Sequence, residues 1–241
     1  MHRFYQPVEA FAGNYINSED RKFISQLSKV LRVKEGDRFM IFDGSGYEYL
    51  SQLVSLTPAL VKFLIIDKKL GEAELKKEII IYPSLLKSDK FDWVLQKVTE
   101  LGVKKIVPVV SDRCIVRDIS SAKESRYLEI LKEATEQCGG AIIPKFDNIF
   151  DFEGAIRSAS EDDGLKLIAW EKDKENTFGE LAGKIRAASK VHIFIGPEGG
   201  YGESEIEYAL NSGIRPFSLG SRILRAETAS LHLVSLLISQ L

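Results

Sequence analysis

Hydrophobic and polar positions follow two different patterns along the chain, and the change between them indicates two structural regions. Up to about residue 70, short strand-like apolar runs at 38–43, 46–56 and 59–67 alternate with turn sequences, and one amphipathic helix is predicted around residues 18–30. These patterns predict a small β-rich module. The charged segment 67–78 has no apolar periodicity beyond its leucines and is the predicted linker.

From residue 78 onward, apolar runs of strand length alternate with helical patterns. Glycines follow several of the predicted helices, as expected where a left-handed residue closes a helix end. This repeated alternation predicts an α/β fold with a parallel sheet covered by helices on both faces, and we expect domains at residues 1–72 and 73–241. The predicted strands are 79–83, 103–110, 165–170, 191–195 and 215–219, and the helices that follow them are 90–101, 123–138, 177–189, 204–212 and 227–241.

Composition narrows the protein class without identifying a partner. The chain has 241 residues, 44% hydrophobic and 28% charged, which suffices for an ordinary globular core. No run approaches the roughly 18 apolar residues of a membrane helix, and the amino terminus does not resemble a secretory signal, so we expect a cytoplasmic protein. The net charge of −2 means that any contact with nucleic acid requires a local basic patch. Cys114 and Cys138 form no metal-binding pattern, and neither a metal nor a disulfide is expected.

Ligands of a parallel sheet bind where loops leave the carboxyl ends of the strands. Three predicted loops qualify, at residues 170–176, 196–203 and 219–228. The second contains Gly199 and Gly200, which allow a ligand to approach the main chain closely. The same glycines also suit a plain turn between a strand and a helix, so this loop alone does not establish a ligand site.

The second loop does not match the common phosphate-binding motifs. It lacks both the G-x-G-x-x-G pattern of dinucleotide sites and the G-K-[ST] sequence of a P-loop. Glu198 would place a carboxylate against a bound anion, so a cationic or neutral ligand fits this loop better. Ser204 and Glu207 have the spacing of a capping box at the start of the following helix.

The third loop places Arg222, Arg225 and Glu227 before a helix that is nearly all apolar. Charged residues at a helix start are most often solvated and need no function when they are considered alone. Their combination with the glycine-rich loop favours a functional site.

Two sequence segments are specific enough to indicate a family. They are GPEGG at 196–200 and LGSRILRAETA at 219–229, and they are accompanied upstream by FDWVLQKVTELGV at 91–103, SDRC at 111–114 and EQCG at 136–139. Together they resemble the RsmE family, the ribosomal small-subunit RNA methyltransferases that methylate a uridine at N3, within the SPOUT superfamily. In the amino-terminal half, RFY at 3–5, VLR at 30–32, EGD at 35–37 and FDGSG at 42–46 resemble the PUA-like RNA-binding module of that family. Gly140 and Gln26 stand where the family usually has an arginine and a histidine.

The resemblance implies a fold, a cofactor and a reaction. It implies a SPOUT domain with a carboxyl-terminal trefoil knot, a small PUA-like β-barrel before it, and an active homodimer. The implied function is methylation of N3 of a uridine in 16S ribosomal RNA, with S-adenosylmethionine as cofactor and without a metal. Two alternatives are a SPOUT enzyme that methylates another RNA atom, such as a ribose 2′-hydroxyl, and a non-catalytic RNA-binding protein with the same fold.

Residue roles follow when the family motifs are carried over to this sequence. Arg225 would stabilise the negative charge that develops on the uracil as N3 loses its proton, since a guanidinium stays protonated and donates twice. Glu198 or Glu227 would receive that proton or hold Arg225, and the sequence leaves both possibilities open. The expected RNA contacts are Arg3, Arg32, Arg113 and Arg117. The expected cofactor residues are Gly196, Pro197, Glu198, Gly199, Gly200, Leu219, Gly220, Ser221, Ile223, Leu224 and Arg225.

The histidines within predicted elements are not expected to be catalytic. His192 lies in a strand between apolar residues, and His232 lies inside the last helix. A histidine in such a position is more often a core or interface residue with satisfied hydrogen bonds than a general base.

Overall fold

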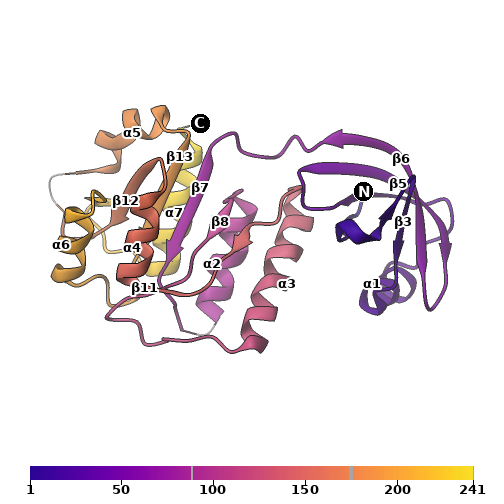
Figure 1. The fold of residues 1–241 in the computed structure, drawn as a ribbon, viewed down its shortest axis with the longest axis horizontal. Helices are drawn as coiled ribbons and strands as arrows, with labels where there is room; N and C mark the ends of the chain where they lie inside the picture. The colour runs from indigo at the N-terminus through magenta and orange to yellow at the C-terminus, as the bar shows by residue number, and fades with distance from the viewer. Residues whose placement is uncertain (88, 174–175, 241) are drawn as a thin grey trace. The chain divides into compact units, whose positions relative to one another are not determined.

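The computed structural model describes residues 1–87, 89–173 and 176–240, and its contacts divide the chain into two compact units (Figure 1). The first unit comprises Met1–Glu74 and Thr135–Ile143, and the second comprises Leu75–Ala134 and Pro144–Leu241. The sequence pattern places a single boundary between residues 72 and 73. It does not indicate the return of residues 135–143 to the first unit, because this segment begins within a regular helix.

The first unit is built on a six-stranded mixed sheet in the order β1-β4-β5-β6-β3-β2. Strands β1 and β4 pair in parallel, and the other neighbours are antiparallel. The runs predicted at 38–43, 46–56 and 59–67 are confirmed as β4, β5 and β6, whereas β1, β2 and β3 were not predicted. The strands are β1 Arg3–Tyr5, β2 Phe11–Ala12, β3 Tyr15–Ser18, β4 Arg38–Phe42, β5 Tyr47–Leu56 and β6 Val61–Leu70.

The predicted helix of the first unit is shorter at its start and irregular at its end. Asp20 caps α1 (Arg21–Ser25) by accepting hydrogen bonds from two backbone N–H groups, and a π-helical turn (Gln26–Leu31) continues it. The turn ends at Arg32, which has a left-handed backbone with φ of 52°. This conformation is uncommon for a residue other than glycine. Phenylalanine rings from the helix and the sheet form the core of the unit: Phe4, Phe23, Phe39 and Phe63.

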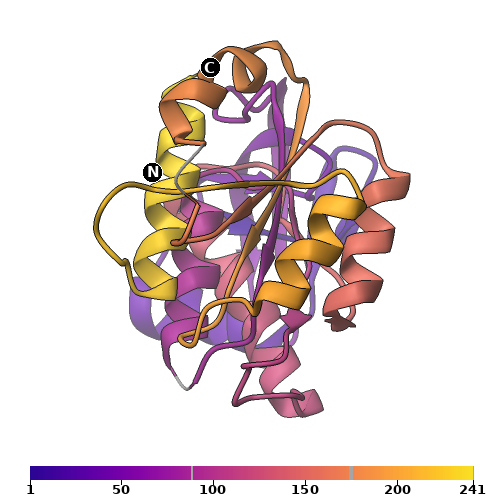
Figure 2. The ribbon, with the colours of Figure 1, turned by 90° about the vertical axis from the view of Figure 1, so that its left-hand side faces the viewer.

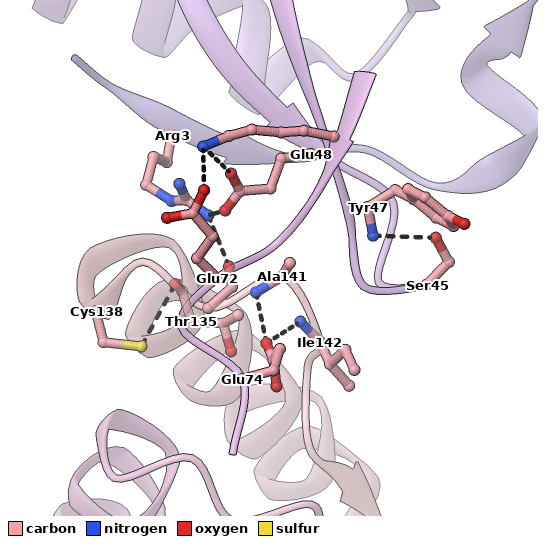
Figure 3. Close-up of polar contacts among 12 residues, drawn as sticks. Arg3, Ser45, Tyr47, Glu48, Glu72, Glu74, Thr135, Cys138, Ala141 and Ile142 are labelled. Carbon is pink, nitrogen blue, oxygen red and sulfur yellow. Dashed lines mark hydrogen bonds and ion pairs between the residues drawn. The ribbon is translucent and has the colours of Figure 1, made fainter. Parts of the chain in front are cut away.

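Arg3 joins the segment 135–143 to the sheet of the first unit (Figure 3). Its Nη2 donates to Glu48 Oε1 at 2.7 Å and to the carbonyl oxygen of Gly140 at 3.0 Å. Glu48 is buried and also lies 3.6 Å from the ammonium of Lys69. The guanidinium predicted to contact RNA therefore has internal partners in this unit.

Hydrogen bonds between a carboxylate and the backbone link the segment 135–143 to the rest of the first unit at two further points. Glu74 Oε1 accepts from the N–H groups of Ala141 and Ile142 at 2.8 and 3.0 Å (Figure 3), and Glu136 Oε1 accepts from the N–H of Tyr5 at 2.9 Å. These bonds satisfy backbone groups that would otherwise need solvent. Removal of residues 1–72 alone would take away Tyr5 and Arg3 as partners of this segment and would leave Glu74 in place.

The second unit contains six parallel strands in the order β10-β8-β7-β13-β12-β14, which confirms the predicted α/β fold with a parallel sheet. The run predicted at 103–110 is broken near Pro108 into two short strands, and the second of them pairs with β11 outside the main sheet. The strands are β7 Glu78–Pro83, β8 Lys105–Ile106, β9 Val109–Val110, β10 Lys145–Phe146, β11 Phe150–Asp151, β12 Leu165–Ala169, β13 Lys190–Ile195 and β14 Arg215–Phe217.

Helices cover both faces of this sheet, as predicted. Figure 2 shows α4 and α6 on one side of the strands and α2 and α7 on the other, where α2 packs against α7. Helix α4 was not predicted, although Asp151 caps it by accepting from the N–H of Gly154 at 2.7 Å. The end of the last predicted helix at Leu241 lies outside the described residues. The helices are α2 Asp89–Glu100, α3 Ser121–Cys138, α4 Phe152–Glu161, α5 Phe178–Ala187, α6 Glu203–Asn211 and α7 Ala226–Ile238.

The described residues contain no helix that is both long enough and apolar enough to cross a membrane.

His192 is a core residue of β13, in agreement with the sequence-based interpretation. Its side chain is fully buried, with Nδ1 3.1 Å from the hydroxyl of Tyr82 and Nε2 2.8 Å from the carbonyl oxygen of Asp163. Burial lowers the pKa of His192, and this effect outweighs the opposing hydrogen bond to Asp163 and the charge of Asp162. The imidazole is therefore neutral in the folded protein at neutral pH.

The buried His192 gives a pH dependence of stability with a defined sign. Its pKa is lower in the folded than in the unfolded state, so the unfolded state binds more protons once the pH falls below about 6.5. We expect the free energy of unfolding, measured by urea denaturation, to be lower at pH 5.5 than at pH 7.5. His192→Gln should lose less stability than the wild type over the same interval. An equal loss in both proteins would show that His192 does not contribute.

Candidate functional site

A cavity of about 300 Å³ lies at the carboxyl ends of β12, β13 and β14, at the sheet edge that the sequence predicted. Its walls come from the three loops that follow these strands. The first loop contributes Trp170 and Glu171 to the cavity wall. Residues 174 and 175 of that loop lie outside the described residues. The other two loops contribute most of the wall.

The predicted cofactor residues line this cavity, with the exception of Ser221 and Arg225. The loops that follow β13 and β14 meet in space because both strands flank β12. About 20 residues of helix and strand separate these loops in the sequence. The sequence-based cofactor set omitted further wall residues, which lie at strand ends, in the two loops and in the first turns of α7. These are Ala169, Ile195, Tyr201, Ser218, Arg222, Ala226 and Ala229.

The glycines of the β13–α6 loop are required by contacts within the protein. Gly200 has φ of +66°, a conformation that side chains rarely adopt, and a Cβ on Gly196 would lie 3.3 Å from the buried ring of Tyr201. A Cβ on Gly199 would lie 3.1 Å from Cβ of Arg113. The close approach at Gly199, which the sequence analysis assigned to a ligand, is made in this structure by Arg113.

The start of α6 differs from the predicted capping box of Ser204 and Glu207. Gly202 is the N-cap, and Glu205 Oε2 accepts from its N–H at 2.8 Å. Glu205 is buried, and its other oxygen accepts from the N–H of Asp112 at 3.0 Å. The prediction was wrong because the N-cap lies two residues earlier than the sequence indicated. Glu205 thus also ties α6 to the loop after β9.

The two candidate proton acceptors differ in their hydrogen bonding. Burial opposes ionisation of Glu198, but bonds from the backbone N–H groups of Glu198 and Lys87 and from Lys90 outweigh it and lower the pKa of Glu198. Glu227 lies in the first turn of α7, and its buried Oε2 has no hydrogen-bond partner among the residues that the structure describes. The Glu198 carboxylate is therefore a weak proton acceptor, whereas Glu227 has an unoccupied acceptor position.

Trp170 contributes a second buried polar atom without a partner. Its indole Nε1 donates to no group in the described part of the protein, and its side chain lines the cavity. Buried donors in proteins are nearly always paired, so an unpaired one in a cavity wall points to a ligand acceptor. Ile223 and Leu224 add apolar surface to the same cavity.

Arg225 stands beside the cavity and is exposed. It is the N-cap of α7, and its neighbours Leu224 and Ala226 both line the cavity. Its guanidinium makes no hydrogen bond or ion pair with any residue that the structure describes. A free, permanently charged group at this position is available to a second ligand at the mouth of the cavity.

The four arginines predicted to contact RNA are divided between the two units. Arg113 and Arg117 are exposed on the loop between β9 and α3, and Arg113 Nη1 donates to the carbonyl oxygen of Gly199 at 2.8 Å. Arg32 is exposed at the left-handed end of the π-helical turn, and Arg3 has the internal partners described above. Within residues 1–87, 89–173 and 176–240, no three His, Cys, Asp or Glu side chains form a group that could hold a metal.

The cavity combines apolar walls, an indole donor and carboxylates, with arginines at its mouth. Apolar and aromatic surfaces suit a flat heterocycle, and a carboxylate in the wall suits a positively charged group. The positive charge of the exposed Arg225 favours a negative charge that develops just outside the cavity. These features suit transfer of a group from a cationic donor in the cavity to a nucleophile that becomes negatively charged.

Comparison with known proteins identifies the family. Residues 73–238 match the family model of the RNA methyltransferase domain, and residues 27–66 match that of the RNA methyltransferase PUA domain. Ribosomal RNA small subunit methyltransferase E of Bacillus subtilis is 30% identical over 218 residues, which cover 88% of this chain and 85% of the relative. The chain belongs to the ribosomal RNA small subunit methyltransferase E family. The resemblance inferred from GPEGG and LGSRILRAETA is thereby confirmed.

Two solved structures of methyltransferases share the fold over nearly the whole chain. The methyltransferase E of Neisseria gonorrhoeae, bound to S-adenosylmethionine, has 30% identity and a TM-score of 0.88, covering 99% of this chain and 97% of that one. A putative methyltransferase from Legionella pneumophila, in complex with S-adenosylmethionine, has 29% identity and a TM-score of 0.88, covering 98% and 96%.

Proposed function

We propose that this chain is an S-adenosylmethionine-dependent enzyme that methylates N3 of a uridine in the 16S ribosomal RNA of the small subunit. One observation carries the proposal: the two family motifs form a single cavity in which a buried indole donor has no partner among the described residues. The cavity fits S-adenosylmethionine, since Ile223 and Leu224 suit its adenine and Glu198 suits its positive charge. Residues 73–241 would then form the methyltransferase domain.

The chemistry requires the protein to align two reactants and to remove one proton. When bound, S-adenosylmethionine supplies a methyl group on a sulfonium, and the C–S bond breaks as the N3–C bond forms, with the bonding electrons remaining on sulfur. The protein residues hold the uracil in line with that methyl and exclude water, which favours a reaction between opposite charges. The N3 proton must pass to an acceptor at the site.

We assign the role of proton acceptor to Glu227. The buried Oε2 of Glu227 has no hydrogen-bond partner in the described part of the chain, whereas Glu198 is bound by backbone N–H groups and Lys90. A base must have a free acceptor within reach of the proton. Glu198 instead forms part of the cavity wall, where its negative charge faces the cationic donor.

We assign charge stabilisation to Arg225. As N3 loses its proton, negative charge spreads to the uracil carbonyl oxygens, and a fork of N–H donors stabilises it most strongly when it is already in place. Arg225 is exposed, has no partner among the described residues and adjoins the cavity.

RNA would be held by basic residues of both units. Residues 1–72, the PUA-like domain, contribute Arg32, while Arg113 and Arg117 lie beside the cofactor loop and suit phosphates near the target base. Arg3 was expected to contact RNA directly. Its bonds to Glu48 and Gly140 support a role in shaping the RNA-binding unit instead.

The finer features of the fold and its assembly are part of the same proposal. Strand β14 lies on the far side of β12 from β13, and α7 then returns to pack on α2, a path that supports a trefoil knot. We further propose a PUA-like β-barrel, an active homodimer and a cytoplasmic location, where small subunits are assembled.

The proposal is tested by transfer of a labelled methyl group from S-adenosylmethionine to purified small ribosomal subunits, with large subunits as the matched control. We expect label in 16S RNA and none in large-subunit RNA. Binding of S-adenosylmethionine without transfer to either would identify a non-catalytic RNA-binding protein with this fold.

A further inference from the structure

Lys90 lies between the two acidic residues of the site. It projects from the first turn of α2, and its Nζ is 3.3 Å from Glu198 Oε1 and 4.0 Å from Glu227 Oε2. The three residues come from three separate elements: α2, the β13–α6 loop and α7. One ammonium thus joins the wall of the cavity to the helix that carries the proposed base.

The burial of these groups distinguishes them from an ordinary surface ion pair. The side chain of Glu227 is 17% exposed and that of Glu198 is 27% exposed, while Lys90 is 37% exposed. Exposed pairs contribute little because water screens them. Removal of a cation from partly buried carboxylates leaves their negative charges unpaired and free to repel each other, which has a much larger effect.

We propose that Lys90 is a positioning residue for methyl transfer. Its ammonium holds the Glu198 loop against α7 and orients the Glu227 carboxylate, whose Oε2 accepts no hydrogen bond from the described residues and stays available to the proton. The contact to Glu198 is short enough for a hydrogen bond, whereas the contact to Glu227 is an ion pair only. Lys90 therefore orients Glu227 through charge alone and donates no hydrogen bond to the oxygen that accepts the proton.

This inference rests on the proposed function for the role of Glu227, but the three-residue contact can be tested without the reaction. A double-mutant cycle of Lys90→Met and Glu227→Gln, measured by urea denaturation, separates a direct interaction from independent effects. We expect the double variant to lose less stability than the sum of the two single losses. Lys97→Met is the matched control, because Lys97 lies on the same helix and pairs with Glu100 at 2.7 Å. The stability loss of Lys97→Met should add to the stability loss of Glu227→Gln.

Binding and rate provide the functional part of the test. Calorimetric titration with S-adenosylmethionine should show weaker binding to Lys90→Met than to wild type, because Glu198 in the cavity wall loses its partner. The single-turnover rate should fall about tenfold in Lys90→Met, recover largely in Lys90→Arg, and fall no further when Lys90→Met is added to Glu227→Gln. Lys97→Met should leave both affinity and rate unchanged.

The outcomes separate the two claims. If the wild type binds S-adenosylmethionine but transfers no methyl group, the proposed function fails, while the stability cycle and the affinities still decide whether Lys90 holds the site together. Additive stability losses together with unchanged affinity would overturn the role of Lys90. A Lys90→Met rate equal to that of the wild type would overturn it as well.

Discussion

Replacement of Glu227 with glutamine is expected to lower the single-turnover rate of methyl transfer by about a hundredfold or more, the range typical for loss of a general base. Glutamine keeps the shape of the side chain and removes only its charge and its capacity to take the proton. S-adenosylmethionine affinity should change little, because Glu227 does not line the cavity. The measurement is single-turnover methylation of small subunits at saturating cofactor.

Glu198→Gln is the matched control for this variant. Glu198 lines the cavity and has a lowered pKa, so its loss should weaken cofactor binding more than it slows the chemical step. A large rate loss in Glu198→Gln combined with a normal rate in Glu227→Gln would reverse the assignment of the proton acceptor.

Replacement of Arg225 with lysine is expected to lower the rate by about a hundredfold, the usual scale for loss of one preorganised donor to a developing negative charge. Lysine keeps the positive charge but lacks the planar fork of two donors. Arg225→Ala should be at least as slow. Cofactor affinity should stay close to that of the wild type in both variants, because the Arg225 side chain is not part of the cavity wall.

The prediction for Arg225 depends on its separation from the cofactor. Unchanged single-turnover rates in both variants would remove Arg225 from the chemistry. A loss of cofactor affinity as large as the loss of rate would instead make it a cofactor-binding residue, as the family motif alone implied.

Most long periodic elements of the fold were predictable from the sequence, although helix α4 was missed, whereas most short strands were not predicted individually. Strands β7 and β13 and helices α2, α3 and α6 have clear apolar patterns, and their bounds differ from the prediction by a few residues. The two-residue strands β8 to β11 are too short for a period to appear. Their position is set by pairing with distant strands, which a local pattern does not record.

The walls of the site were predictable because two specific motifs form them. The contacts that each wall residue makes were not predictable. Gly199 was expected to admit a ligand, yet its neighbour is Arg113, which lies 86 residues away in the sequence. Lys90 and Glu198 are separated by 108 residues, and nothing local to either predicts their contact. Burial and pairing of charges depend on tertiary structure, and they decide which of two similar carboxylates is free to act.

The measurement that most directly tests the account is identification of the methylated nucleoside in 16S RNA after reaction with the wild-type protein. The RNA is digested to nucleosides, and the labelled product is compared with standards by mass and chromatographic retention. The account predicts N3-methyluridine, with yield reduced in single turnover by Glu227→Gln and Arg225→Lys. A methyl group on a ribose 2′-hydroxyl, or on any base atom other than uridine N3, would contradict it.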